Sequence, residues 1–507
     1  MEDTAYVQLR GIRKSFGSVV ANDGIDLDLR KGEIMALLGE NGSGKSTLMN
    51  ILSGIYSPDG GRITVGGKEH VFSSPADSIA AGIGMVYQHF KLVDVFTAKE
   101  NIIAGRRGSF LTRGKGTARS LAGLAERYGL SFDPDKKVYN MSVGEKQAVE
   151  ILKVLHRGAD VLILDEPTAV LTPQEIRSLF AILRNLKRSG CAVVIITHKL
   201  NEVLEISDRV TILRKGRCVG TVMTAQTDAG ALTEAMVGKP ISLSIERPET
   251  DPKLVRPILS VEGLTVLNGE KRRALDGVSF ALNSGEILGF AGIAGSGQKE
   301  LCEAIYGMTP AESGKIIFKG EDIVGKKPRD MIKLGISMSF VPEDRLGMGL
   351  VAGMDIADNV MLKSYRNRRG AFIDRQAGRR KAERIIREFS IDTTGPSQIV
   401  RRLSGGNIQK VLLGREIDTD PQLLITAYPS RGLDIGASYN IYDVLNGQKK
   451  KGIGILFIGE DLDVLMELCD RIAVIHGGRI MGVVKPEQTT KEKIGLMMLG
   501  RKEEEAS

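Results

Sequence analysis

The chain has 507 residues, which is too long for one ordinary hydrophobic core, so we expect two or more domains. Its composition, 42% hydrophobic and 26% charged, is typical of a globular protein, and no apolar run approaches the roughly 18 residues that span a bilayer. The net charge of +8 suits nucleic acid, an anionic membrane or a solvated exterior, but no Lys/Arg cluster alternates with aromatic residues as single-strand binders require. Four cysteines without C-x-x-C spacing and five dispersed histidines argue against a disulfide framework or a histidine metal cluster.

The first motif along the chain is a glycine-rich loop, 39–47. It follows a predicted strand at 34–38 and opens a predicted helix whose pattern is seen at 48–52. It matches the pattern G-x-x-x-x-G-K-[ST], in which backbone N–H groups and the helix N-terminus bind phosphate oxygens. We expect Lys45 to reach the β- and γ-phosphates of a nucleoside triphosphate and the Ser46 hydroxyl to bind Mg²⁺. A glycine-rich turn without a ligand is the alternative. The predicted ATP-binding residues of the loop are Gly39, Glu40, Asn41, Gly42, Ser43, Gly44, Lys45, Ser46 and Thr47.

Two further strand ends carry polar side chains. An apolar run at 161–164 ends in Asp165 and Glu166, and a second run at 193–196 precedes His198. A buried strand would bring both acids to the edge of the sheet that carries the glycine loop. Asp165 would then hold Mg²⁺ through water, and Glu166 would polarise the water that attacks the γ-phosphate. His198 would touch the γ-phosphate, with a structural histidine as the alternative.

The same order of motifs occurs in both halves of the chain. A second glycine loop, Gly292–Gly297, follows an apolar run at 287–291, and Gly44 and Gly297 lie 253 residues apart (297 − 44). The pairs Ser142/Ser404 and Asp208/Asp470 are each 262 residues apart (404 − 142 and 470 − 208). In both copies strand-like runs alternate with helices, which predicts a largely parallel α/β core.

These repeats predict three segments. We expect a first domain at 1–245, a linker at 246–257 and a second domain at 258–507. Three prolines among charged residues predict that the linker is short, extended and solvated. The middle portions of the two copies, about 97–157 and 354–417, have helical patterning.

Both copies carry a motif that resembles the signature of ABC ATPases, Ser142–Gln147 in the first and Leu403–Asn407 in the second. Glycine loop, Gln88, signature, acidic pair and histidine follow one another in the order of that family, and the resemblance covers nearly all of both halves. It implies an α/β fold of two tandem ABC-type P-loop NTPase domains. Each would have a RecA-like, mainly parallel sheet core, an antiparallel β part and a helical subdomain.

The resemblance also implies that the domains pair head to tail, with ATP between the glycine loop of one and the signature of the other. The first such site would have every role filled. Phe16 would stack on adenine, and the second half would supply Ser404, Gly405, Gly406 and Asp434 as ATP-binding residues. Its catalytic residues would be Glu166, His198 and Gln88, and its metal ligands Ser46, Gln88 and Asp165.

The second site would lack the groups for hydrolysis. Gln298 replaces the lysine, Lys299 the metal-binding hydroxyl, and Ala427 and Tyr428 the two carboxylates. The replacements of the glutamine and the histidine are Glu343 and Glu460. Without lysine, metal ligands or base, charge on a transferring phosphoryl group is uncompensated. We therefore expect one hydrolytic site and one that is structural or binds nucleotide without cleaving it.

The tandem form resembles ATP-binding subunits of bacterial importers for simple sugars and nucleosides, and 86–90 and 165–175 look closest to the nucleoside branch. This resemblance implies an ATPase, with ATP and Mg²⁺, peripheral at the cytoplasmic face of the cell membrane. It also implies two integral membrane permease subunits, an external substrate-binding protein and no nucleic acid. Permease helices would dock near Gln88 on the apolar segment His89–Phe96, which otherwise is an ordinary loop.

Three other functions fit parts of the sequence. An importer of pentoses or other simple sugars differs only in its substrate, and an exporter is possible on the chemistry of the ATP site alone. A soluble tandem ABC ATPase acting on ribosomes or nucleic acid would suit the positive charge. Such proteins resemble one another in a long, charged helical linker and two intact sites, whereas this linker is short and broken by proline.

Overall fold

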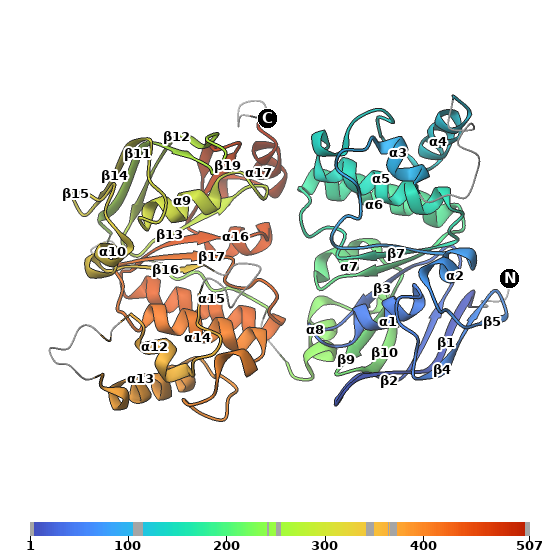
Figure 1. The fold of residues 1–507 in the computed structure, drawn as a ribbon, viewed down its shortest axis with the longest axis horizontal. Helices are drawn as coiled ribbons and strands as arrows, with labels where there is room; N and C mark the ends of the chain where they lie inside the picture. Colours follow the sequence, from blue (N-terminus) through green and yellow to red (C-terminus); the bar gives the residue numbers. More distant parts are fainter. Residues whose placement is uncertain are drawn as a thin grey trace. The chain divides into compact units, whose positions relative to one another are not determined.

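The computed structural model of the protein describes residues 5–104, 115–240, 243–249, 255–340, 349–363, 365 and 373–501. The chain divides into two compact units, Met1–Ser242 (unit 1) and Leu243–Ser507 (unit 2) (Figure 1).

Unit 1 contains two sheets. The smaller is antiparallel with the strand order β2-β1-β4-β5, and the larger has the order β10-β9-β3-β8-β7-β6. All neighbouring strands of the larger sheet pair in parallel except β10, which is antiparallel to β9. The strands are β1 (Val7–Phe16), β2 (Val19–Leu29), β3 (Ile34–Leu38), β4 (Gly60–Val65), β5 (Lys68–His70), β6 (Ile83–Val86), β7 (Val161–Asp165), β8 (Ala192–Ile196), β9 (Arg209–Arg214) and β10 (Arg217–Met223).

Helices cover both faces of the larger sheet (Figure 1). The helices of unit 1 are α1 (Lys45–Leu52), α2 (Pro75–Ala80), α3 (Ala98–Ile103), α4 (Lys115–Tyr128), α5 (Val143–His156), α6 (Pro173–Arg188), α7 (Leu200–Ile206) and α8 (Ala229–Val237). Strand β7 shows why both faces are buried: Val161 and Ile163 pack with α1 and the antiparallel sheet, whereas Leu162 and Leu164 pack with α5 and α6. This two-sided burial produces the continuous apolar run in the sequence.

Unit 2 repeats this plan. Its antiparallel sheet has the order β12-β11-β14-β15, and its larger sheet the order β16-β17-β18-β13-β19-β20, parallel except for β20. The strands are β11 (Pro257–Leu267), β12 (Arg273–Asn283), β13 (Ile287–Ala291), β14 (Ser313–Phe318), β15 (Glu321–Asp322), β16 (Ile336–Phe340), β17 (Leu423–Ala427), β18 (Gly454–Ile458), β19 (Arg471–His476) and β20 (Arg479–Val484). The helices are α9 (Gln298–Ile305), α10 (Pro328–Leu334), α12 (Ile356–Met361), α13 (Arg375–Glu388), α14 (Gly405–Ile417), α15 (Ile435–Lys450), α16 (Leu462–Leu468) and α17 (Lys491–Met498).

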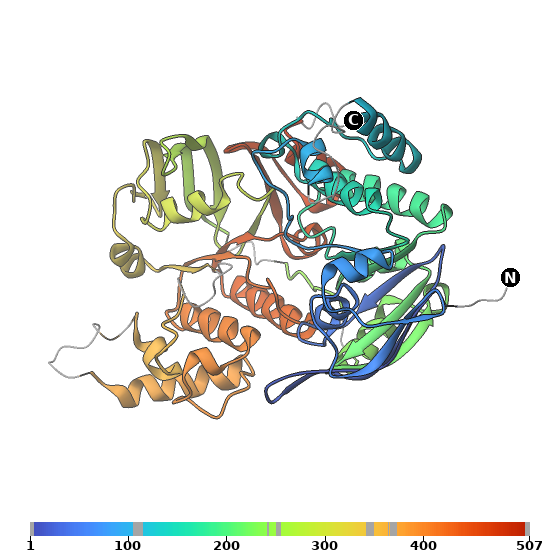
Figure 2. The same cartoon turned by 45° about the vertical axis from the view of Figure 1, so that its right-hand side comes forward.

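The middle of each unit is helical, as predicted. In unit 1, α3 and α4 both pack on α5, and in unit 2, α12 and α13 both pack on α14. The orange helices α12 and α13 lie side by side in both views (Figures 1 and 2). Each unit therefore has a parallel sheet core, an antiparallel sheet and a helical part, which is the predicted fold class.

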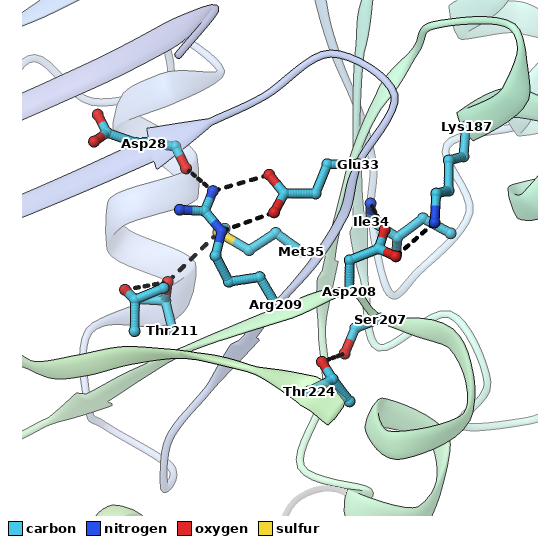
Figure 3. Close-up of polar contacts among 11 residues, drawn as sticks. Asp28, Glu33, Ile34, Met35, Lys187, Ser207, Asp208, Arg209, Thr211 and Thr224 are labelled. Atoms are coloured by element: carbon cyan, nitrogen blue, oxygen red, sulfur yellow. Dashed lines mark hydrogen bonds and ion pairs between the residues drawn. The ribbon is translucent and has the colours of Figure 1, made fainter. Parts of the chain in front are cut away.

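A polar network at the amino end of the central strand explains one of the sequence repeats. In unit 1, Arg209 forms a two-pronged ion pair with Glu33, at 2.8 and 2.9 Å (Figure 3). Asp208 accepts from the backbone N–H of Ile34 at 2.9 Å and pairs with Lys187 at 2.5 Å (Figure 3). Unit 2 has the same contacts at the aligned positions, which are Glu286 with Arg471 and Asp470 with Ile287 and Lys449. The recurring Asp-Arg pair thus anchors the central strand of each sheet.

The predicted linker, 246–257, lies within the second compact unit. Unit 2 begins at Leu243, and β11 already begins at Pro257, so both ends of the predicted segment 246–257 belong to unit 2. Asn446 donates to the carbonyl oxygen of Glu246 at 3.0 Å, and the Arg247 guanidinium donates to the carbonyl oxygen of Cys469 at 2.5 Å and pairs with Glu487. The first residues of the segment therefore have hydrogen bonds to unit 2, while Glu246 and Glu249 are exposed. Among the described helices, none is both long and apolar enough to cross a membrane.

Candidate functional site

The first glycine loop lies between β3 and α1, at the carboxyl edge of the parallel strands. Gly44, immediately before α1, has a φ of 98°, in the left-handed region that favours glycine. A Cβ atom at Gly44 would lie 2.3 Å from the carbonyl oxygen of Ala21, so the chain approaches too closely for a side chain. No side chain caps α1, so its first backbone N–H groups remain available to a ligand oxygen.

The Lys45 side chain folds back over this loop. Its Nζ donates to the carbonyl oxygens of Gly39 at 2.7 Å and Glu40 at 2.9 Å, and the residue is only 8% exposed. Burial lowers the pKa of Lys45, and the negative charges of Glu166, Asp165 and Glu40 act in the opposite direction. The loop therefore holds a cationic donor close to two carboxylates.

Three strand ends bring Gln88, Glu166 and His198 together. Gln88 Nε2 donates to Glu166 Oε2 at 3.0 Å, and His198 Nδ1 lies 3.0 Å from Glu166 Oε1. The hydrogen bond with His198 lowers the pKa of Glu166 below its usual 4.5, against the effect of burial. Glu166 is therefore ionised at neutral pH, and both of its carboxylate oxygens are held in place.

Asp165, at the end of β7, is a carboxylate that a bound cation would stabilise. Burial and, as a smaller cause, the negative charge of Glu166 together raise its pKa to about 6, against the opposing effect of Lys45. In the neighbouring loop, Ser43 Oγ is buried and has no hydrogen-bond partner within the described residues, while Ser46 in the first turn of α1 is exposed. An uncapped helix, an unpartnered hydroxyl and a carboxylate with a raised pKa together fit a phosphate chain that carries Mg²⁺.

An exposed aromatic pair stands in the antiparallel part of unit 1. Phe16, at the end of β1, is 43% exposed, and its ring centroid lies 5.3 Å from that of Tyr56 in an edge-to-face arrangement. Lys14 Nζ lies 5.7 Å from the Phe16 centroid. The sequence predicted Phe16 as a stacking surface, but it did not predict Tyr56 beside it.

The two signature segments begin helices. Ser142 caps α5, accepting from the backbone N–H of Glu145, and Ser404 caps α14, accepting from that of Asn407. Asp434 caps α15, accepting from the backbone N–H of Ala437 at 2.7 Å. A Cβ atom at Gly406 would lie 3.3 Å from the Leu433 side chain, so in unit 2 the helix start that carries Ser404, Gly405 and Gly406 adjoins the helix start that carries Asp434.

In unit 1, a carboxylate from α6, Glu175, contacts the signature segment. Glu175 Oε2 accepts from the backbone N–H and the hydroxyl of Thr172, each at 3.0 Å, and Oε1 accepts from the backbone N–H of Gly144 at 3.2 Å. The aligned residue of unit 2 is Ala437 (437 − 175 = 262), so no carboxylate occupies this position there. The two signatures therefore differ at one backbone N–H group. In unit 1 the Gly144 N–H donates to the Glu175 carboxylate, and in unit 2 an alanine stands in place of that glutamate.

The second glycine loop keeps its backbone but not its chemistry. Gly297 precedes α9 with a φ of 109°, as Gly44 precedes α1. Gln298, in place of the lysine, donates from Nε2 to the carbonyl oxygen of Ile293 at 3.3 Å, and Lys299 is exposed, 3.7 Å from Glu303. The side chain in the lysine position therefore carries no charge.

The carboxylate positions of unit 2 are also changed. Ala427 is completely buried at the end of β17, and burial raises the pKa of the Tyr428 phenol to about 12. Arg431 pairs with Glu460 at 3.4 Å and lies 5.7 Å from the centre of the Tyr428 ring. Glu343, the sixth predicted replacement, lies outside the described residues.

Comparisons with known proteins bear on this arrangement. The family model described as ABC transporter matches residues 22–169 and 275–429. Nucleoside import ATP-binding protein NupA of Lactococcus lactis is 43% identical over 99% of this chain and 99% of its own length.

Two other relatives match over nearly the full length. Guanosine import ATP-binding protein NupO of Bacillus subtilis is 42% identical over 99% of this chain and 98% of its own. Ribose import ATP-binding protein RbsA 1 of Rubrobacter xylanophilus is 42% identical over 97% of this chain and 98% of its own. With its two matched segments and these relatives, the chain belongs to the ABC transporter family.

Proposed function

We propose that this chain is the ATP-hydrolysing, energy-coupling subunit of an importer for nucleosides. The observation that carries the ATPase part is the contact of Gln88 and His198 with the ionised Glu166, beside the loop that holds Lys45. The nucleoside part rests on the relatives whose names state nucleoside and guanosine import.

In this proposal the residues of the site have distinct tasks, and Gln88 has two of them. Lys45 leaves the carbonyl oxygens of its own loop and neutralises the β- and γ-phosphates, whose oxygens accept from the N–H groups that begin α1. Glu166 orients and polarises the attacking water, and Gln88 and His198 hold its carboxylate in place. Phe16 stacks on adenine, with Tyr56 supporting its ring.

The metal ligands proposed are Ser46, Gln88 and Asp165. Mg²⁺, when bound, would neutralise charge on the β- and γ-phosphate oxygens. The raised pKa of Asp165 and the exposed position of Ser46 support this assignment.

Only one site hydrolyses ATP in this proposal. Ser404, Gly405, Gly406 and Asp434 complete the site of unit 1, and the site with Gln298, Ala427 and Tyr428 is structural or retains nucleotide without cleaving it. A neutral amide in place of the lysine and a phenol in place of the base support this division, because neither compensates the charge of a transferring phosphoryl group.

The proposed partners are two membrane permease subunits and an external substrate-binding protein, with the chain peripheral at the cytoplasmic face of the membrane. The segment His89–Phe96 supports a docking role, because Val93, Val95 and Phe96 are 45%, 65% and 40% exposed. Import of ribose or another simple sugar is the second candidate, favoured by the relative named for ribose import.

Uptake measurements in cells test the proposal. The source organism lacking this chain is complemented with the wild type, with Glu166→Gln or with no protein, and radiolabelled guanosine and ribose are supplied separately. We expect guanosine uptake to return with the wild type and not with Glu166→Gln, while ribose uptake is the same in all three strains. Dependence of ribose uptake alone would replace nucleosides by sugars, and full uptake with Glu166→Gln would refute the assigned base.

A further inference from the structure

Glu150 is a buried carboxylate on α5 that none of the assigned roles uses. The residue is 3% exposed, and its Oε1 accepts from the backbone N–H of Lys91 at 2.6 Å. Its Oε2 pairs with Lys153 Nζ at 2.7 Å, and Lys153 Nζ also donates to the carbonyl oxygen of Lys91 at 3.1 Å. Side chains of α5 therefore bind both polar groups of the Lys91 backbone.

Lys91 lies three residues after Gln88, in the segment that leads out of the candidate site. Two residues after Lys91, the backbone of Val93 is held by a side chain of α3. Asn101 accepts from the Val93 N–H at 2.8 Å and donates to the Val93 carbonyl oxygen at 3.1 Å. The segment 88–93 is thus fixed twice, to α5 at Lys91 and to α3 at Val93. Gln88 stands at the inner end of this segment, and its side chain reaches Glu166.

The same helix also fixes the turn that carries Glu166. Gln147 Nε2 donates to the carbonyl oxygen of Pro167 at 2.9 Å, and Gln147 is one helical turn before Glu150. The segments that carry Gln88 and Glu166 are therefore both attached to α5, at Lys91 and at Pro167. The 3.0 Å hydrogen bond between them closes this set of contacts.

Unit 2 has a different residue at the aligned position. Leu412 stands where Glu150 stands in unit 1 (412 − 150 = 262), and it has no side-chain acceptor. Arg415, aligned with Lys153, pairs with Glu416 at 2.8 Å. A leucine therefore packs well in this position of the fold, and a buried ion pair is seldom more stable than well-packed apolar side chains. Stability alone does not account for the glutamate of unit 1.

We propose that Glu150 is a positioning residue for ATP hydrolysis in unit 1. Its carboxylate fixes the Gln88–Val93 segment to α5 and thereby holds the Gln88 amide on the Glu166 carboxylate. This inference rests on the proposed function, because it requires that Gln88 and Glu166 act in hydrolysis. It adds a residue that acts through the backbone of Lys91 and not by direct contact with Glu166.

The test compares Glu150→Leu, which installs the residue of unit 2, with Glu150→Gln, which keeps an acceptor for the Lys91 N–H. We expect Glu150→Leu to lower kcat about tenfold, because a small displacement of a catalytic group costs up to about 100-fold in rate. The Kd for ATP should stay within about twofold, since the glycine loop that supplies most of the phosphate contacts is unchanged. Glu150→Gln should retain most of kcat, and amide hydrogen exchange at Lys91 should accelerate only in Glu150→Leu.

Glu33→Gln is the matched control, because it removes a partly buried, ion-paired carboxylate, with an 11% exposed side chain, at the opposite edge of the same sheet. It should lower the thermal midpoint and leave kcat unchanged. If Glu150→Leu leaves kcat unchanged, or lowers kcat and ATP affinity equally, the positioning role is wrong. Glu166→Gln, assayed in parallel, separates the two claims: a fully active Glu166→Gln would refute the proposed function itself.

Discussion

Glu166 and Tyr428 occupy aligned positions with different chemistry and the same backbone. Both have a left-handed conformation that is uncommon outside glycine, with φ of 44° and 55°. Both backbone N–H groups donate at 2.8 Å to the end of the next strand, at Ile196 and Ile458. The turn is therefore made by the backbone, and the loss of the carboxylate in unit 2 is a change of chemistry within a preserved geometry.

Asp165 gives a prediction about pH. Its pKa in the folded chain is about 6, above the usual 3.8. The ionised carboxylate therefore destabilises the folded state fully above the folded-state pKa. This destabilisation shrinks as the pH falls below about 6, and it disappears toward pH 3.8. Without nucleotide and Mg²⁺, Asp165→Asn should raise the free energy of unfolding of unit 1 by about 2 to 3 kcal/mol near pH 8, and by clearly less near pH 5. Urea denaturation at the two pH values measures the difference. An equal gain at both would show that the carboxylate is not strained by burial.

At the scale of elements, the sequence predicted those features that a local pattern encodes. The strand, loop and helix around Lys45 follow from glycine spacing and an apolar run, and β7 with its two acids follows from another. The contact of Glu150 with the Lys91 backbone was not predictable, because Glu150 lies 59 residues away and the sequence around it has the pattern of an ordinary helix. Tyr56 and Glu175 were missed for the same reason. The one available signal was the capping-box spacing of Thr172 and Glu175, which indicates a helix start but not the contact with Gly144.

The double role of Glu175 leads to a prediction about α5 and α6. Its carboxylate caps α6 and also accepts from Gly144, so Glu175→Ala should weaken the first turns of both helices, by about 1 to 2 kcal/mol in opening free energy. Glu100→Ala removes a comparable capping box on α3 that has no contact with the signature, and should affect α3 alone. Amide hydrogen exchange of the helix starts measures both variants. Exchange that changes only in α6 would mean that the Gly144 contact contributes nothing.

At the scale of the whole molecule, the chain is one fold encoded twice, and the catalytic side chains that we propose all lie in unit 1. The sequence repeats predicted the tandem fold, and the aligned motifs expose each replacement directly, from Gln298 to Tyr428. The attachment of the linker was not predictable, since Arg247 binds the carbonyl oxygen of Cys469, 222 residues later. Charge and proline content do not reveal whether a distant acceptor is in reach.

The central claim is that one of the two glycine loops supports hydrolysis. The most direct measurement is the steady-state ATPase rate of Lys45→Ala beside that of Gln298→Ala, with the wild type as reference. We predict that Lys45→Ala lowers kcat by about 100-fold or more, because it removes a preorganised charge from the phosphate site. Gln298→Ala should leave kcat close to the wild-type value. An equal loss in both variants would contradict the account, because both loops would then take part in the chemistry.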